Sequence, residues 1–372
     1  MRPQGVGGYL LLEDATAFPG RLLSDPQEGL GEVVFTTNHT GYQEVLTDPS
    51  FAGQVVVMTA PMIGNYGTRP EDAQSRRPWV AGFVVKNLSD AAPRGREPLP
   101  AYLERHRIPT LVGADTRAIT RHIREAGAMR AGIFPAALDE AEALPRVIAE
   151  PPMTGRDLAT AVSAPEPYRL EHPDAQGCVV CLDYGVKQRS LDLIREAGYS
   201  VLVAPAATST HELLEARPAG VFVSNGPGDP EAVPGAAEKV RALSDAGLPI
   251  FGICLGLQLV ARAFGGRTYK LPYGHRGGNH PVKNLDTGGV EITSQNHGFA
   301  VHATGDVLDD APDLRVTHLN LNDGTVEGIA HISRPVFAVQ YHPESAPGPH
   351  DSRYLFDQFI SAMHTTASTA TG

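Results

Sequence analysis

The first stretch with chemical potential is FGICLGLQ, residues 251–258, where Cys254 ends an apolar run and has a glycine two residues away on either side. Residues 249–254 read as a buried strand and 255–264 as a helix, which places Cys254 at the corner between them. G-x-C-x-G in that context has the form of a nucleophile elbow, a turn so sharp that glycines are needed on both sides. A helix starting at residue 255 directs its positive end at the sulfur and favours the thiolate. Free cysteines are more often small buried apolar residues, but this position predicts a nucleophile.

A thiol nucleophile needs a base, and the base needs a group that orients it. The segment VFAVQYHPES, residues 336–345, offers both, because a strand is expected to end at His342 and Glu344 lies two residues later. Two residues of extended chain project to the same side. Most histidines are ordinary surface or core residues, yet this spacing beside an elbow cysteine predicts a Cys254, His342 and Glu344 triad.

An oxyanion formed at such a site is usually held by backbone N–H groups. One candidate is the N–H of Leu255, directly after the nucleophile. The other lies in SNGPGDP, residues 224–230, where Gly226 and Gly228 allow close approach of the backbone to a ligand. The stretch lacks the lysine of a phosphate-binding loop, and an ordinary turn remains an equally good interpretation of it.

The elements that would position these groups alternate regularly after residue 177. Four strand-like runs, 178–183, 200–205, 220–225 and 249–254, are each followed within a few residues by a helical pattern. Such repeated strand–helix units predict an α/β fold with a doubly wound, mostly parallel sheet. Ligands of these sheets bind beyond the carboxyl ends of the strands, where Cys254 and the SNGPGDP stretch fall.

The first half of the chain has a different pattern and predicts a strand-rich α+β domain. Short apolar runs at 9–12, 32–37, 54–59 and 80–85 indicate strands. Helices are expected at 115–126, capped by Asp115 and ended by Gly127, and at 139–148. The domains are expected at 1–150 and 178–365, joined by a proline-rich linker at 151–177 and followed by a disordered tail at 366–372.

Composition narrows the class of protein. The 31 Lys and Arg residues against 42 Asp and Glu give a net charge of −11, which disfavours nucleic acid and anionic membranes as partners. No apolar run approaches the length of a membrane helix, and three cysteines in a long chain favour a reducing, cytoplasmic location. Cys178 and Cys181 are expected to be core residues on opposite faces of a strand. His275 and His280 stand close together but have no further ligands nearby, so no metal site is predicted.

The motifs resemble those of a known family. GICLG with HPE resembles the class I, triad-type glutamine amidotransferases, which hydrolyse the side-chain amide of glutamine through a cysteinyl thioester. SNGPGDP, GGNHPV and SQNHGFAV narrow the resemblance to the small, glutaminase chain of carbamoyl-phosphate synthase. TGYQEVLTDPSF, GNYGT and ADTRAITRHIREAGAMRAGIF are similar to the N-terminal domain of that chain. The resemblance covers about residues 8–362.

Carried over position by position, the resemblance implies Cys254 as nucleophile, with His342 and Glu344 completing the triad. It implies L-glutamine as substrate, contacted by Ser50, Gly226, Gly228, Leu255, Gln258, Asn296, Gly298 and Phe299. It also implies a ligase complex in which this chain has no cofactor of its own. Ammonia would pass to a large synthetase subunit that uses ATP, Mg²⁺ and bicarbonate to make carbamoyl phosphate for arginine or pyrimidine synthesis.

Two other functions fit parts of the sequence. A free-standing cysteine peptidase or γ-glutamyl hydrolase would use the same elbow, but leaves the family-like N-terminal half unexplained. A non-catalytic regulatory subunit on the same fold would have no chemical need for Cys254, His342 and Glu344 together. The sequence leaves open the oligomeric state, the allosteric effectors, the pathway served, the ammonia route and the activity of the isolated chain.

Overall fold

A computed structural model of the chain describes residues 6–24 and 28–370. The chain divides into two compact units, Met1–Arg156 with Pro272–Gly277, and Asp157–Leu271 with Gly278–Gly372. The division falls after Arg156, inside the range 151–177 expected for the linker, and a short stretch of the C-terminal half belongs to the first unit. None of the described helices combines the length and the apolar character needed to span a membrane.

The N-terminal unit is built on a closed barrel with the strand order β1-β2-β8-β6-β4-β3-β9. Strands β8, β6, β4 and β3 run parallel to one another, and the remaining pairs are antiparallel. The strands are β1 (Gly7–Leu12), β2 (Ala17–Leu22), β3 (Gly29–Thr36), β4 (Gln54–Met58), β6 (Gly82–Val85), β8 (Thr110–Val112) and β9 (Met129–Pro135). Strands β5 (Met62–Ile63) and β7 (Asn87–Leu88) form a separate small sheet.

All seven barrel strands contribute buried side chains to one apolar cluster, which is the interior of the barrel. Helix α3 (Thr116–Ala126) adds Ile119 and Ile123 to this cluster. It begins and ends as predicted, because the Asp115 carboxylate accepts from the Ala118 N–H at 3.0 Å and Gly127 follows its last turn. The second predicted helix is α4 (Glu140–Ala149).

The opposite faces of the barrel strands are covered by the other helices of this unit. Leu11 and Phe134 pack against α4, and a cluster containing Val34 and Phe83 packs against α1 and α2. The covering elements are α1 (Tyr42–Thr47), η1 (Pro49–Phe51) and α2 (Leu99–Arg105), whereas η2 (Pro70–Asp72) has no buried residue.

The C-terminal unit contains a twelve-stranded mixed sheet with the main order β10-β12-β11-β13-β14-β21-β20-β19-β15-β16. Its first part is the predicted one, because β12, β11, β13, β14 and β21 are parallel neighbours. These strands are β11 (Cys178–Asp183), β12 (Ser200–Pro205), β13 (Gly220–Val223), β14 (Ile250–Ile253) and β21 (Val336–Val339).

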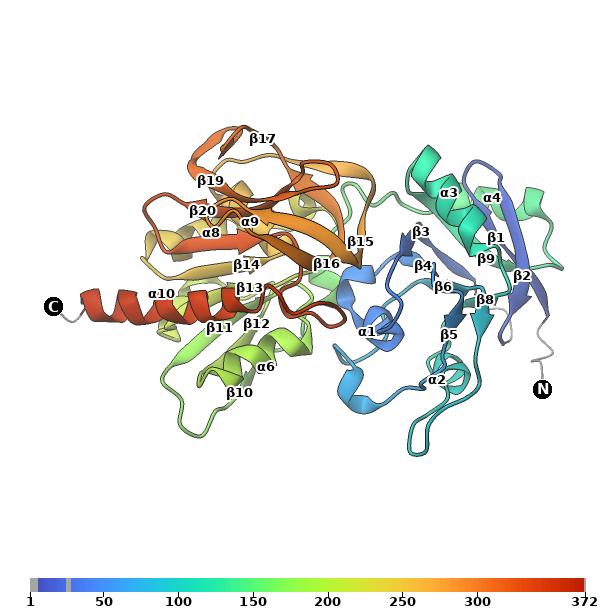
Figure 1. Ribbon diagram of the computed structural model, residues 1–372, viewed down its shortest axis with the longest axis horizontal. Helices are drawn as coiled ribbons and strands as arrows, with labels where there is room; N and C mark the ends of the chain where they lie inside the picture. The colour runs from blue at the N-terminus through green and yellow to red at the C-terminus, as the bar shows by residue number, and fades with distance from the viewer. Residues whose placement is uncertain (1–5, 25–27, 371–372) are drawn as a thin grey trace. The chain divides into compact units, whose positions relative to one another are not determined.

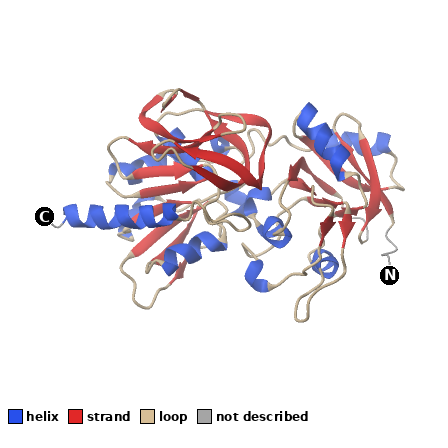
Figure 2. Cartoon of the chain, viewed as in Figure 1, coloured by secondary structure: helices blue, strands red, loops and turns tan. Residues whose placement is uncertain are grey.

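The rest of this sheet is antiparallel where its pairing is resolved, which the alternating pattern of the sequence did not predict. Figure 2 draws these strands in red, like all other strands of the chain. They are β10 (Tyr168–Leu170), β15 (Thr268–Asn284), β16 (Val290–Val301), β17 (Ala303–Thr304), β18 (Val307–Leu308), β19 (Ala311–Asn320) and β20 (Val326–His331).

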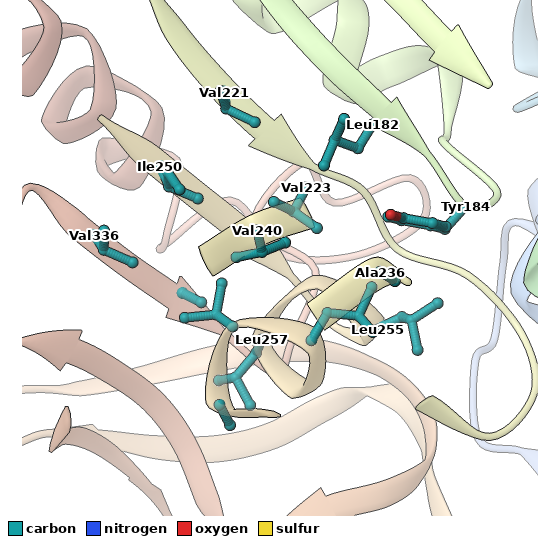
Figure 3. Close-up of a cluster of buried hydrophobic side chains, with 14 of the residues drawn as sticks. Leu182, Tyr184, Val221, Val223, Ala236, Val240, Ile250, Leu255, Leu257 and Val336 are labelled. Carbon is teal, nitrogen blue, oxygen red and sulfur yellow. The ribbon is translucent and has the colours of Figure 1, made fainter. Parts of the chain in front are cut away.

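Helices cover both faces of the parallel strands, as a doubly wound sheet requires. Val221, Val223 and Ile250 face a cluster formed with α7, α8 and α9, part of which is shown in Figure 3. Phe222 and Phe251 point to the other face and pack against α6 and α10. The helices are α5 (Ala159–Val162), α6 (Gln188–Glu196), α7 (Thr210–Glu215), η3 (Pro230–Ala232), α8 (Ala236–Asp245), α9 (Leu255–Ala263) and α10 (Tyr354–Ala370), most of them labelled in Figure 1.

The C-terminal residues depart from the prediction of a disordered tail at 366–372. Helix α10 runs to Ala370, so that within this segment residues 371–372 alone lie outside the described part of the chain. Buried Phe359 and Met363 anchor the helix, and the Thr365 and Thr366 hydroxyls donate to carbonyls four residues earlier. The small polar side chains of this stretch are thus compatible with a helix.

Candidate active site

Cys254 occupies the predicted elbow between β14 and α9. Its φ of 56° and ψ of −106° lie in a region that non-glycine residues rarely adopt, which is the strained corner of such a turn. A Cβ on Gly252 would lie 2.8 Å from the carbonyl carbon of Gly256, and a Cβ on Gly256 would lie 2.2 Å from the Val223 carbonyl oxygen. Glycine is therefore required on both sides of the nucleophile.

The elbow is fixed to the neighbouring strand and presents a buried thiol. The Cys254 N–H donates to the Val339 carbonyl at 2.8 Å, which continues the pairing of β14 with β21. The Cys254 side chain is 2% exposed, and its thiol donates to the Asn296 carbonyl at 3.5 Å. In this arrangement the thiol proton points to a backbone oxygen, so that it must turn toward a base before the sulfur can react.

His342 and Glu344 follow β21 and form the predicted pair. The His342 backbone N–H donates to the Ser294 carbonyl at 2.8 Å, which fixes the chain after the strand. Its imidazole Nδ1 lies 2.8 Å from Glu344 Oε1, and both side chains are buried. Because a carboxylate only accepts, Nδ1 carries the proton and donates it, which leaves Nε2 as the atom that can exchange a proton with the thiol.

Lys187 is a member of this site that the sequence analysis missed. Its ammonium lies 2.6 Å from Glu344 Oε1 and donates to the Ala346 carbonyl at 3.1 Å, and the side chain is 2% exposed. Lys187 caps α6 after β11, at the carboxyl edge of the parallel sheet. A lysine just beyond an apolar strand at that edge is the signal that could have identified it.

The three ionisable groups shift one another's pKa values. Burial alone would raise the pKa of Glu344, but the charges of Lys187 and His342 outweigh it and lower the pKa to about 2. Burial and Lys187 lower the pKa of His342, whereas the charge of Glu344 and the hydrogen bond to it raise the pKa, with a net upward shift. The Glu344 carboxylate thus stays ionised, and the imidazolium that His342 forms when it takes a proton from the thiol is stabilised.

The SNGPGDP stretch lies beside the elbow rather than forming an isolated turn. A Cβ on Gly226 would lie 2.8 Å from Leu255 Cδ2 and 2.1 Å from the Tyr184 carbonyl oxygen. Ser224 accepts from the Tyr184 N–H at 2.9 Å, and Asn225 donates to the Gly185 carbonyl at 2.9 Å. These buried polar contacts hold the loop after β13 against the chain after β11, and the close approach of Gly226 to Leu255 places it beside the start of α9.

The other residues that the family resemblance implied as glutamine contacts are distributed over both units. Gln258 lies on α9 and is buried, Gly228 has a φ of 89° in the SNGPGDP loop, and Asn296, Gly298 and Phe299 lie on β16. Gln258 Nε2 donates to the Phe299 carbonyl at 3.0 Å, and the Cys254 thiol donates to the Asn296 carbonyl, so α9 and the elbow lie against β16 at these residues.

Ser50 is the one implied contact in the N-terminal unit. It lies on η1, where its backbone N–H donates to Asp48 Oδ1 at 2.9 Å. The preceding helix α1 is held by Gln43, whose amide bonds to the backbone N–H and carbonyl of Arg69. The TGYQEV and GNYGT motifs meet beside it, because the Tyr42 hydroxyl donates to the Gly67 carbonyl at 2.7 Å.

The two remaining cysteines are free. Cys181 is fully buried in the core of the sheet, as expected, whereas Cys178 is half-buried at the start of β11. Neither lies in the elbow.

Comparison with known proteins agrees with this division of the chain. Residues 180–362 match the family model for class-I glutamine amidotransferases. Residues 10–133 match the model for the CPSase domain of the carbamoyl-phosphate synthase small chain.

Curated relatives match over almost the whole length. The carbamoyl phosphate synthase small chain of Symbiobacterium thermophilum is 49% identical, with 96% of this chain and 98% of the relative covered. Those of Thermus thermophilus and Methanopyrus kandleri are 47% and 48% identical, each over 95% of this chain and 92% and 98% of their own. With the elbow, the buried His–Glu pair and both family models in one sequence, this chain belongs to the family of carbamoyl phosphate synthase small chains.

Proposed function

We propose that this chain is the glutaminase subunit of a carbamoyl-phosphate synthase and hydrolyses L-glutamine to glutamate and ammonia through a thioester on Cys254. The observation that carries the proposal is the strained elbow of Cys254 at the end of β14, next to the buried His342–Glu344 pair after the neighbouring parallel strand β21. The family's name supplies the substrate class, and the residues supply the chemistry.

In the first half of the reaction His342 Nε2 takes the thiol proton of Cys254, and the thiolate attacks the side-chain carbonyl carbon of glutamine. The oxyanion is held by the backbone N–H groups of Leu255 and Gly226; within the part of the chain that the structure describes, neither N–H has a hydrogen-bond acceptor. His342 then returns the proton to the amide nitrogen, the C–N bond breaks, and ammonia leaves a γ-glutamyl thioester.

In the second half His342 takes a proton from water, and the resulting hydroxide attacks the thioester carbon. The C–S bond breaks, glutamate is released and the Cys254 thiol is regenerated. Glu344 and Lys187 remain ionised throughout; the carboxylate fixes the His342 tautomer and stabilises the imidazolium in both steps.

The substrate pocket would use Gly228, Gln258, Asn296, Gly298 and Phe299 of the C-terminal unit; Ser50 is the further glutamine contact that the family resemblance implies. Glutamine carries an α-ammonium and an α-carboxylate besides its amide, so the pocket needs donors and acceptors at fixed places. Side-chain amides, a hydroxyl and backbone groups near glycines provide them.

The ammonia would be used by a separate large synthetase subunit, which binds ATP and Mg²⁺ and activates bicarbonate in the cytoplasm. We propose no cofactor on this chain. The product, carbamoyl phosphate, would serve arginine synthesis, pyrimidine synthesis or both.

The proposal is tested by carbamoyl phosphate synthesis with the large subunit, using glutamine or ammonia as nitrogen donor. Cys254→Ser is expected to abolish the glutamine-dependent reaction and to leave the ammonia-dependent reaction unchanged. Retained glutamine use in Cys254→Ser, or no coupling of the wild-type chain to the large subunit, would overturn the proposal.

A further inference from the structure

Gln340 is a buried amide beside the active site for which the proposed chemistry has no role. It directly follows β21, two residues before His342, and no part of its side chain is exposed. Its backbone N–H donates to the Glu327 carbonyl at 2.9 Å, which fixes the main chain here. The side-chain Nε2 is buried and has no hydrogen-bond partner among the described residues. An unpartnered buried amide costs stability, so folding alone does not explain a glutamine at this position.

The contact that Gln340 does make is with Gln258. Gln258 Nε2 lies 3.0 Å from the Phe299 carbonyl oxygen and 3.2 Å from Gln340 Oε1. A backbone carbonyl can only accept, so the Gln258 atom that faces Phe299 must be the amide nitrogen. That nitrogen can only donate, so the Gln340 atom that faces it must be the oxygen. Hydrogen-bond chemistry therefore fixes the orientation of both amides, independently of how their atoms are assigned.

This arrangement uses both hydrogens of the Gln258 amide nitrogen. The remaining polar atom, Gln258 Oε1, accepts no hydrogen bond from any residue that the structure describes. The Phe299 carbonyl is also occupied, because His297 Nδ1 lies 2.8 Å from it in addition to Gln258 Nε2. Gln258 can thus offer a ligand only an acceptor. Among the polar groups of glutamine the α-ammonium is the strongest donor, and the α-carboxylate cannot bind to an acceptor at all.

We propose that Gln340 is a positioning residue, which clamps the Gln258 amide so that Oε1 faces the bound amino acid and accepts from its α-ammonium. This inference rests on the proposed glutaminase function and adds a determinant of substrate selectivity to it. Without the Gln340 acceptor, the amide of Gln258 keeps only its bond to Phe299 and is free to rotate about that bond, so the α-ammonium loses a fixed partner.

The test uses the complex with the large subunit and compares Gln340→Met, which keeps the length of the side chain but removes the acceptor, with the wild type. We expect KM for L-glutamine to rise about tenfold or more, the scale of one hydrogen bond to a charged group. The kcat at saturation is expected to stay within about threefold, and ammonia-dependent synthesis to be unchanged, because neither depends on the α-ammonium contact. Gln340→Glu keeps an acceptor oxygen and is expected to restore most of the affinity.

Two further readouts separate positioning from a structural role. The preference for L-glutamine over glutaramate, which lacks the α-amino group, should fall in Gln340→Met by the same factor by which KM rises. In a Gln258→Met background, Gln340→Met should add no further change, since it acts through Gln258. If Gln340→Met does not fold, Gln340→Asn makes the same test, because it withdraws the acceptor and keeps the amide.

Gln54→Met is the matched control. Gln54 is a buried glutamine of the N-terminal barrel, whose amide donates to Glu32 at 3.2 Å. The Gln54→Met substitution should lower the melting temperature and leave unchanged both KM for L-glutamine and the preference over glutaramate. The inference is wrong if Gln340→Met behaves like this control, or if its effect adds to that of Gln258→Met. A wild-type complex that uses ammonia but never glutamine would instead show that the proposed function fails, and the inference with it.

Discussion

The buried ion pair of Lys187 and Glu344 makes a quantitative prediction. Lys187→Met keeps an unbranched apolar stem and removes the ammonium that lies 2.6 Å from the Glu344 carboxylate. Glu344 is fully buried and would be left with His342 as its only cationic partner among the described residues. The perturbation therefore removes the larger of the two charges that lower the pKa of this carboxyl.

Two estimates of the stability lost in Lys187→Met agree. A carboxyl whose pKa falls from 4.5 to about 2 on folding contributes about 3 kcal/mol to the free energy of unfolding at neutral pH. Removing one partner of a buried ion pair typically costs roughly 3–5 kcal/mol. We expect Lys187→Met to lower the free energy of unfolding at pH 7 by about 3 kcal/mol, as measured by urea unfolding of the full chain followed by circular dichroism.

The pH dependence has a definite sign. Because folding lowers the pKa of Glu344, its contribution to the free energy of unfolding is complete above the pKa of the unfolded chain. That contribution is lost as the pH falls toward the pKa of the folded state. The difference between wild type and Lys187→Met should therefore be largest near neutral pH and shrink as the pH falls from about 5 toward 3.

Lys239→Met provides a matched control for this measurement. Lys239 is also a buried lysine of the C-terminal unit, but its ammonium donates to the Ala206 carbonyl at 2.6 Å and burial lowers its pKa. Its replacement should cost about 1 kcal/mol or less, with no dependence on pH in the acid range. A loss below about 1 kcal/mol for Lys187→Met, or an equal loss at pH 7 and pH 3, would refute the reasoning.

Two further predictions concern the elbow and the base. Gly256→Ala places a Cβ 2.2 Å from the Val223 carbonyl oxygen, so it should abolish glutamine hydrolysis and lower the free energy of unfolding by about 1–3 kcal/mol. Gly289→Ala is the control, because its new Cβ would meet only the Thr287 hydroxyl, at 3.3 Å. It should leave activity and stability unchanged in the same glutaminase and urea assays. Folding raises the pKa of His342, so its contribution to stability is complete below the ordinary histidine pKa and is lost as the pH rises through the pKa of the folded state. In urea unfolding, the wild type should therefore lose more stability than His342→Asn as the pH rises above neutrality. Equal losses would contradict the upward shift.

The parallel part of the C-terminal unit was predictable because the residues that specify each strand and helix lie close together in the sequence. Each apolar run from 178 to 254 is followed by an amphipathic helix, and a right-handed crossover leaves little choice of topology. The elbow followed in the same way, since the strand, the corner and the flanking glycines lie within a few residues of Cys254. His342 and Glu344 needed one further step, the expectation that a thiol requires a base with an orienting carboxylate.

What could not be predicted depends on contacts distant along the chain. Closure of the N-terminal barrel requires β1 to pair with both β2 and β9, and no short pattern encodes the second pairing. The antiparallel extension of the sheet contains long polar strands such as β15, whose side chains alternate poorly between buried and exposed. Lys187 was missed because its partner Glu344 lies far along the sequence, and a lysine before a helix normally faces solvent.

The central claim is that Cys254 at this elbow carries the γ-glutamyl group during turnover. The most direct measurement is to mix the complex with radiolabelled L-glutamine, quench it with acid during turnover and locate the label on the chain by peptide mapping. We predict label on the peptide that contains Cys254, none in Cys254→Ser, and wild-type labelling in Cys178→Ser, whose cysteine lies outside the elbow. Label that persists in Cys254→Ser, or glutamine hydrolysis without any acid-stable label on the wild-type chain, would contradict the account.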